Sequence, residues 1–131
     1  MKYLVDTDWV INHLRGVEPI TRKLDDLSPE GLALSIISLA ELYEGVYYSR
    51  NPVRSEEVLK RFLDSELTIL GIDEETCQVF GRERGRLRQE GRSIGDMDLF
   101  IGATCRRHNL TLLTNNRRHF EQVHGLDIVS A

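Results

Sequence analysis

The sequence predicts an α/β fold with three layers, in which helices cover both faces of a parallel sheet of four to five strands. Short apolar, β-branched segments alternate along the chain with longer segments that carry the apolar spacing and the end signals of helices. Because helices separate the successive strands, the connections are crossovers, which join parallel strands. The 131 residues contain no repeat, low-complexity tract or linker, so we expect a single domain over residues 1–131.

The boundaries of the expected elements follow from local patterns. We expect strands at residues 2–5, 32–37, 67–70, 110–113 and 126–129. We expect helices over residues 8–15, 19–27, 38–48, 73–90 and 96–108, and another that begins at Pro52. Ser38 followed by Glu41 is typical of a capping box, in which Ser38 caps the helix and Glu41 lies in its first turn.

Composition indicates an ordinary globular protein, with 40% apolar and 29% charged residues. We find no apolar run of membrane-spanning length and no basic-then-apolar signal segment, and we therefore expect a cytoplasmic protein with no membrane partner. Cys77 and Cys105 lack the spacing of a zinc site or a redox pair, so we interpret them as two reduced thiols.

Acidic, amide and hydroxyl side chains follow the expected strands or open a buried helix. The set comprises Asp6, Asp8, Glu41, Asp96, Asp98, Thr114 and Asn116. Taken singly, each can be a helix cap, a first-turn acid or a turn residue. Taken together, they can converge at the carboxyl ends of parallel strands, where ligands collect. Clustered carboxylates need cations to stay ionised together, and oxygen ligands without a histidine or cysteine set favour Mg²⁺ or Mn²⁺.

Arginines are concentrated in the last part of the chain. The net charge is −4, yet residues 82–118 hold nine arginines and four acidic residues, a local excess of +5. Arginine is well suited to binding phosphate, and we predict that Arg86 and Arg92 contact an RNA backbone. The alternative is a solvated helix face whose arginines pair with neighbours such as Glu83 and Glu90.

Four stretches carry a resemblance to a known family. They are "LVDTD", "ISLAELYEG", "GRSIGDMDLFIGATC" and "LTLLTNNRRHFEQVHGL". In this order and spacing they resemble the PIN-domain ribonucleases, specifically the VapC-type toxins of toxin–antitoxin pairs. The resemblance implies a PIN-like domain that cleaves RNA with Mg²⁺ or Mn²⁺. It also implies a homodimer that a cognate VapB-type antitoxin inhibits by blocking the site.

The resemblance also assigns roles to residues. It implies that Asp6, Glu41, Asp98 and Asn116 form the catalytic set, and that the first three hold the metal. Asn116 stands where many family members have an acid. Asp8, Asp96 and Thr114 are auxiliary positions, and we expect Thr114 and Asn116 to orient water.

Two other interpretations remain open at this point. "DTDWV" matches the signature of haloacid-dehalogenase-like phosphatases, but that fold needs a lysine near the phosphate, and "GDMD" follows a helix where that fold has a strand. A catalytically inactive PIN module would bind RNA or a partner without cleavage. We further expect the helix with Tyr43, Tyr47 and Tyr48, and the helix after Pro52, to form an antitoxin groove, a dimer contact, or both.

Overall fold

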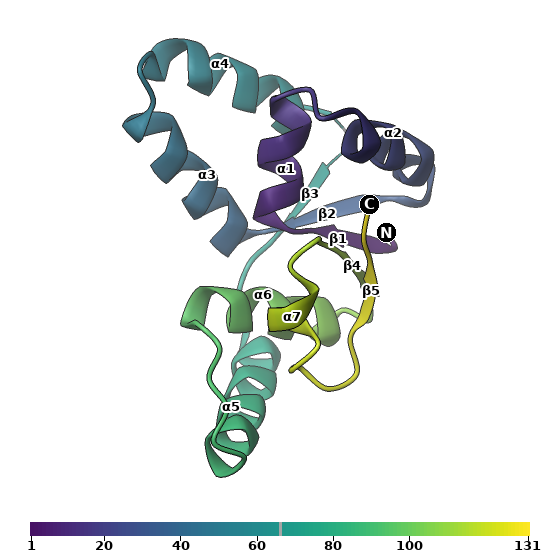
Figure 1. Ribbon diagram of the computed structural model, residues 1–131, viewed down its shortest axis with the longest axis vertical. Helices are drawn as coiled ribbons and strands as arrows, with labels where there is room; N and C mark the ends of the chain where they lie inside the picture. Colours follow the sequence, from purple (N-terminus) through teal and green to yellow (C-terminus); the bar gives the residue numbers. More distant parts are fainter. Residues whose placement is uncertain (66) are drawn as a thin grey trace.

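Five short parallel strands form the centre of the protein, which we describe from a computed structural model of residues 1–65 and 67–131 (Figure 1). They are β1 (Tyr3–Val5), β2 (Leu32–Ser35), β3 (Leu67–Leu70), β4 (Thr111–Leu113) and β5 (Asp127–Val129). Their order in the sheet is β3-β2-β1-β4-β5, and every neighbouring pair is parallel. The predicted parallel sheet is therefore confirmed, with its first strand in the middle.

Helices cover both faces of this sheet, which confirms the three-layer prediction. They are α1 (Thr7–Leu14), α2 (Glu18–Leu27), α3 (Ile36–Tyr48), α4 (Pro52–Leu63), α5 (Glu74–Gln89), α6 (Asp96–Arg107) and α7 (Arg117–Phe120), with a 3₁₀ turn at Ser28–Glu30. Figure 1 shows α1 to α4 on one side of the strands and α5 to α7 on the other. Within the described residues, no helix has the length and apolar content needed to cross a bilayer.

The two faces of β1 are buried in separate cores. Tyr3 and Val5 pack with residues of α1 to α4, among them the fully buried Trp9. Leu4 points to the opposite face and packs with residues of α6 and α7, including Ile101. This alternation follows from the two-residue period of a strand. Because both faces are covered, the polar groups at the strand ends can meet solvent only along the edge formed by those ends.

Helix α3 begins two residues earlier than expected, so the predicted capping box is wrong. Its cap is Ser35, whose side chain accepts a hydrogen bond of 3.1 Å from the N–H of Ile37. Ser38 lies inside the helix and is fully buried. The capping pattern does not distinguish between two serines three positions apart, and tertiary packing decides the choice. As a consequence, Glu41 lies in the second turn and is not used as a cap.

Candidate active site

The ends of β1 and β4 hold the first pair of site residues. Asp6 caps α1, and its Oδ1 accepts a hydrogen bond of 2.8 Å from the N–H of Thr7. Its Oδ2 accepts a hydrogen bond of 2.7 Å from the hydroxyl of Thr114, which is fully buried at the end of β4. Both oxygens of Asp6 are therefore fixed in place by neighbouring backbone and side-chain donors.

A cavity of about 510 Å³ opens at this rim of the sheet. Its lining residues come from the ends of β1 and β4, from α1 and α3, and from the start of α6: Asp6, Thr7, Asp8, Ile11, Glu41, Asp98, Asn115 and Asn116. The four residues of the predicted catalytic set thus line one cavity, with Asp8 beside them. Thr114 lies behind Asp6, in contact with it.

The orientation of Glu41 is set by a hydroxyl from α1. Thr7 donates a hydrogen bond of 2.7 Å from Oγ1 to Oε1 of Glu41. The same Oγ1 lies 2.9 Å from the hydroxyl oxygen of the buried Ser38. Ser38 and Glu41 are three residues apart within α3, so they lie on one face of the helix. Both therefore contact Thr7.

Burial and mutual repulsion disfavour the charged forms of two of these acids. Burial, followed by the nearby Asp8 carboxylate, raises the pKa of Asp6 to about 7, although the hydrogen bonds from Thr114 and Thr7 oppose this change. Burial also raises the pKa of Asp8, and the charge of Asp98 adds to the effect. A cation in the cavity would relieve the cost of keeping these groups ionised.

The residues present fit a hard divalent cation. Oδ1 of Asp8 is buried and has no hydrogen-bond partner among the described residues, which is costly for a carboxylate oxygen unless an ion satisfies it. The donor set is made of carboxylate and amide oxygens, as Mg²⁺ and Mn²⁺ prefer. In the part of the chain that the structure describes, no three acidic, histidine or cysteine side chains stand in a ready-made coordination geometry. Since like charges separate when no cation holds them together, a bound ion would draw these side chains inward.

Besides Thr114, three predicted residues lie outside the cavity and do not contact its acids. Asp96 is largely exposed, and its Oδ1 accepts a hydrogen bond of 2.6 Å from Arg84. Arg86 pairs with Glu83 at 3.0 Å and with Glu90, as the alternative interpretation of the arginines expected. Arg92 is exposed and forms no ion pair with any described residue.

Sequence reasoning did not assign one residue at the edge of the site. His119 lies in the short helix α7, which we did not predict, and its Nδ1 is 3.0 Å from Oδ2 of Asp98. The same nitrogen is 3.1 Å from Nδ2 of Asn116. The three-residue spacing of Asn116 and His119 would have been a signal only if the helix had been predicted.

The geometry does not support a phosphatase of the haloacid-dehalogenase type. None of the three lysines, Lys2, Lys23 and Lys60, lines the cavity. Asp98 lies on α6, which follows α5 and not a strand of the sheet. Both features that this fold would need at the phosphate are therefore missing from the cavity.

Comparison with known proteins identifies the family to which this fold and its acidic cavity belong. The family model described as the PIN domain matches residues 3–126, and the chain belongs to this family. Ribonuclease VapC2 of Haemophilus influenzae is 36% identical over 128 residues, which cover 96% of this chain and 95% of the relative. The tRNA(fMet)-specific endonuclease VapC of Shigella flexneri is 30% identical over 126 residues, again 96% and 95% of the two chains. The crystal structure of VapBC2 from Rickettsia felis, bound to a DNA fragment from their promoter, contains a similar chain with a TM-score of 0.91, 30% identity and 99% and 98% coverage.

Proposed function

We propose that the protein is a VapC-type endoribonuclease toxin that hydrolyses RNA with Mg²⁺ or Mn²⁺ and is inhibited by a VapB-type antitoxin. The observation that carries the proposal is the convergence of Asp6, Asp8, Glu41 and Asp98 on one cavity, with a buried oxygen of Asp8 that lacks a partner. Relatives over nearly the whole length of the chain are named a ribonuclease and a tRNA(fMet)-specific endonuclease, which supports the same reaction.

Each residue has a role in this proposal. Asp6 and Asp98 would hold the ion, Glu41 would bind it directly or through a water, and Asn116 would orient water with its amide. When bound, the ion supplies an activated water and stabilises negative charge on the phosphate oxygens. Thr114 and Thr7 act as positioning residues, because their hydroxyl groups fix the carboxylates of Asp6 and Glu41.

The RNA backbone would be held by exposed arginines beside the site. Arg86 is engaged by Glu83 and Glu90 and is only 20% exposed, so we assign this role to Arg92. Arg92 lies in the loop between α5 and α6, and α6 carries Asp98. Because this loop is close in sequence to Asp98, we propose that an RNA strand held there extends along α6 to the cavity. Contacts of this kind position a strand without reading its sequence.

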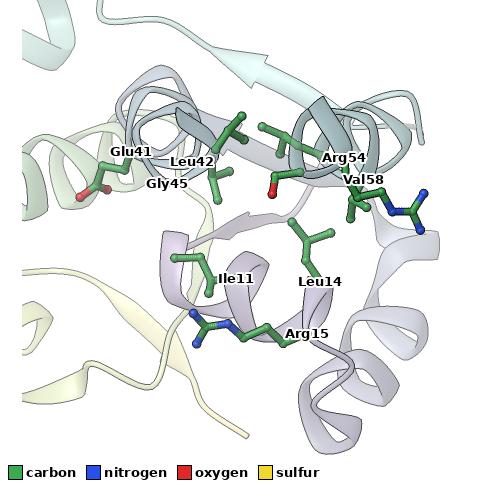
Figure 2. A pocket seen from close by; sticks show the side chains of 11 residues that line it. Ile11, Leu14, Arg15, Glu41, Leu42, Gly45, Arg54 and Val58 are labelled. Atoms are coloured by element: carbon green, nitrogen blue, oxygen red, sulfur yellow. The ribbon is translucent and has the colours of Figure 1, made fainter. Parts of the chain in front are cut away.

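An apolar groove lies between α1, α3 and α4 (Figure 2), and it supports a binding site for the antitoxin. The groove has a volume of about 360 Å³, and its walls include Leu14, Leu42 and Val58. Ile11 and Glu41 line both the groove and the acidic cavity. We therefore propose that an antitoxin segment packs along the groove and ends over Glu41, where it blocks access to the ion.

The homodimer that the resemblance implies stays a prediction. Tyr47 is 66% exposed and Tyr48 is 87% exposed at the end of α3. Exposed aromatic side chains are enriched at protein interfaces. Neither tyrosine lines the groove, but Tyr48 lines an adjoining hollow with Ile11 and Glu41, so the dimer contact that we propose would lie directly beside the antitoxin site.

The proposed function is tested by RNA cleavage with controlled metal. The protein is purified without its antitoxin, treated with EDTA, and incubated with total RNA before and after Mg²⁺ or Mn²⁺ is restored. We expect cleavage only with the ion, and inhibition when the product of the neighbouring reading frame is added. RNA that is bound but never cut, with either ion, would identify an inactive binding module.

A further inference from the structure

The contact between His119 and Asp98 is the strongest feature of this rim that the proposed function does not use. Nδ1 of His119 is 3.0 Å from Oδ2 of Asp98 and 3.1 Å from Nδ2 of Asn116. The side chain of Asp98 is 27% exposed and that of His119 is 51% exposed. The imidazole therefore lies at the open edge of the cavity, against two of its lining residues.

The hydrogen-bond pattern around this nitrogen is mismatched. A neutral imidazole carries either a hydrogen or a lone pair on Nδ1, never both. With the hydrogen, Nδ1 donates to Asp98 but faces the amide hydrogens of Asn116. With the lone pair, it accepts from Asn116 but faces a lone pair of the Asp98 carboxylate. In this orientation of the amide, neither tautomer satisfies both neighbours, whereas a half turn of the amide lets the Nδ1 hydrogen face two oxygen acceptors.

A divalent cation would satisfy the same atoms by coordination. Ligand atoms that are adjacent in an octahedron with bonds of about 2.1 Å lie about 3.0 Å apart. This matches the 3.0 Å between Nδ1 of His119 and Oδ2 of Asp98. A half turn of the Asn116 amide would present its oxygen to the same point. Nε2 of His119 has no hydrogen bond to any described residue, so it can carry the ring hydrogen while Nδ1 binds the ion.

We propose that Nδ1 of His119 is a direct ligand of the ion held by Asp98, and that it makes the site prefer Mn²⁺ to Mg²⁺. Imidazole suits transition metals, whereas Mg²⁺ is usually held by oxygen atoms. The proposal rests on the metal-dependent function set out above and adds a nitrogen ligand to it. Asn116 offers only a neutral amide at this edge of the cavity, so the imidazole would supply the ion with a stronger donor beside it.

The test is pulsed electron paramagnetic resonance of Mn²⁺ bound to the untagged protein. Nitrogen coordinated to Mn²⁺ produces a ¹⁴N modulation of the spin echo, which a residue that acts only through hydrogen bonds would not produce. We compare the wild type with His119→Gln and with the control His124→Gln, which removes an exposed imidazole five residues away. The modulation should be present in the wild type and the control and absent in His119→Gln.

A binding measurement completes the test. His119→Gln should weaken Mn²⁺ binding by about tenfold or more while changing the Mg²⁺ affinity much less. Wild-type protein that binds Mn²⁺ without ¹⁴N modulation, or modulation that persists in His119→Gln, would overturn the assignment of His119 and leave the proposed function intact. Wild-type protein that binds neither ion would overturn both.

Discussion

Thr114 donates a hydrogen bond of 2.7 Å from its hydroxyl to Oδ2 of Asp6, although the two residues are 108 positions apart in the sequence. The bond joins the ends of β1 and β4, which are neighbours in the sheet. It fixes one oxygen of Asp6, while the N–H of Thr7 fixes the other. Two donors therefore hold the buried carboxylate of Asp6 at the edge of the sheet without an ion.

Replacement of Thr114 by valine should loosen this arrangement. Valine keeps the shape of threonine but leaves a buried carboxylate oxygen without its donor, which should lower the free energy of unfolding by about 1–3 kcal/mol. Mn²⁺ affinity should fall by about tenfold or more, as for other partners that orient metal ligands. Isothermal titration calorimetry and denaturant unfolding measure both, and Thr114→Ser should restore them. Wild-type Mn²⁺ affinity in the valine variant would show that the hydroxyl does not position Asp6.

The pKa of Asp6 predicts how stability changes with pH in the metal-free protein. The pKa is about 7 in the folded protein and 3.8 ordinarily, so between these values the folded state binds more protons than the unfolded state. Stability should therefore fall as pH rises from about 4 to 7, by on the order of a few kcal/mol. Asp6→Asn should flatten this dependence, with the part due to Asp8 remaining, and should abolish RNA cleavage. Unfolding curves whose stability rises with pH over this range would contradict the account.

The groove of Figure 2 predicts a variant that separates inhibition from catalysis. Val58→Glu places a charge on the apolar wall formed by α4, and should weaken antitoxin binding by at least about tenfold while RNA cleavage is unchanged. Val53→Glu is the matched control, because Val53 lies on the same helix, is 71% exposed and does not line the groove. Equal loss of antitoxin binding in both variants, measured by calorimetry, would place the antitoxin elsewhere.

The arginines predict a contrast between two substitutions. Arg92→Ala should reduce the slope of log K against log salt for single-stranded RNA by about 0.7. Arg86→Ala should leave that slope unchanged and lower the free energy of unfolding by about 1–3 kcal/mol, since it removes a partner of the buried Glu83. Fluorescence anisotropy across a salt series measures the slopes. A flattened slope in Arg86→Ala alone would reverse the two assignments.

The sheet and the main acids of the cavity could be predicted because their signals are local. Apolar segments separated by helices specify parallel strands, and acids at strand ends must meet at one rim. Of the main acids, only Asp6 directly follows a strand, whereas Glu41 and Asp98 lie on helices and were grouped with it through the family resemblance. The structure places all three around one cavity.

Other features depended on contacts that no local pattern contains. Asp96 and Asp98 are two residues apart on one helix, so they point about 200° apart and only one can face the cavity. Which one does so is set by how α6 packs on the sheet. His119 contacts Asp98 only because α7 folds back over the start of α6. The engagement of Arg86 was partly visible, because Glu83 and Glu90 stand three and four residues from it.

The metal site at the edge of the sheet is tested by comparing the rates of RNA cleavage by Asp98→Asn and by Asp96→Asn. The two substitutions make the same chemical change two residues apart on α6, but Asp98 lines the cavity and Asp96 is exposed and paired with Arg84. With Mn²⁺ present and folding checked by circular dichroism, Asp98→Asn should cleave at least about 100-fold more slowly than the wild type, because an ion ligand is lost. Asp96→Asn should cleave within a few-fold of the wild-type rate. Wild-type cleavage by a folded Asp98→Asn variant would contradict the metal site on which the account depends.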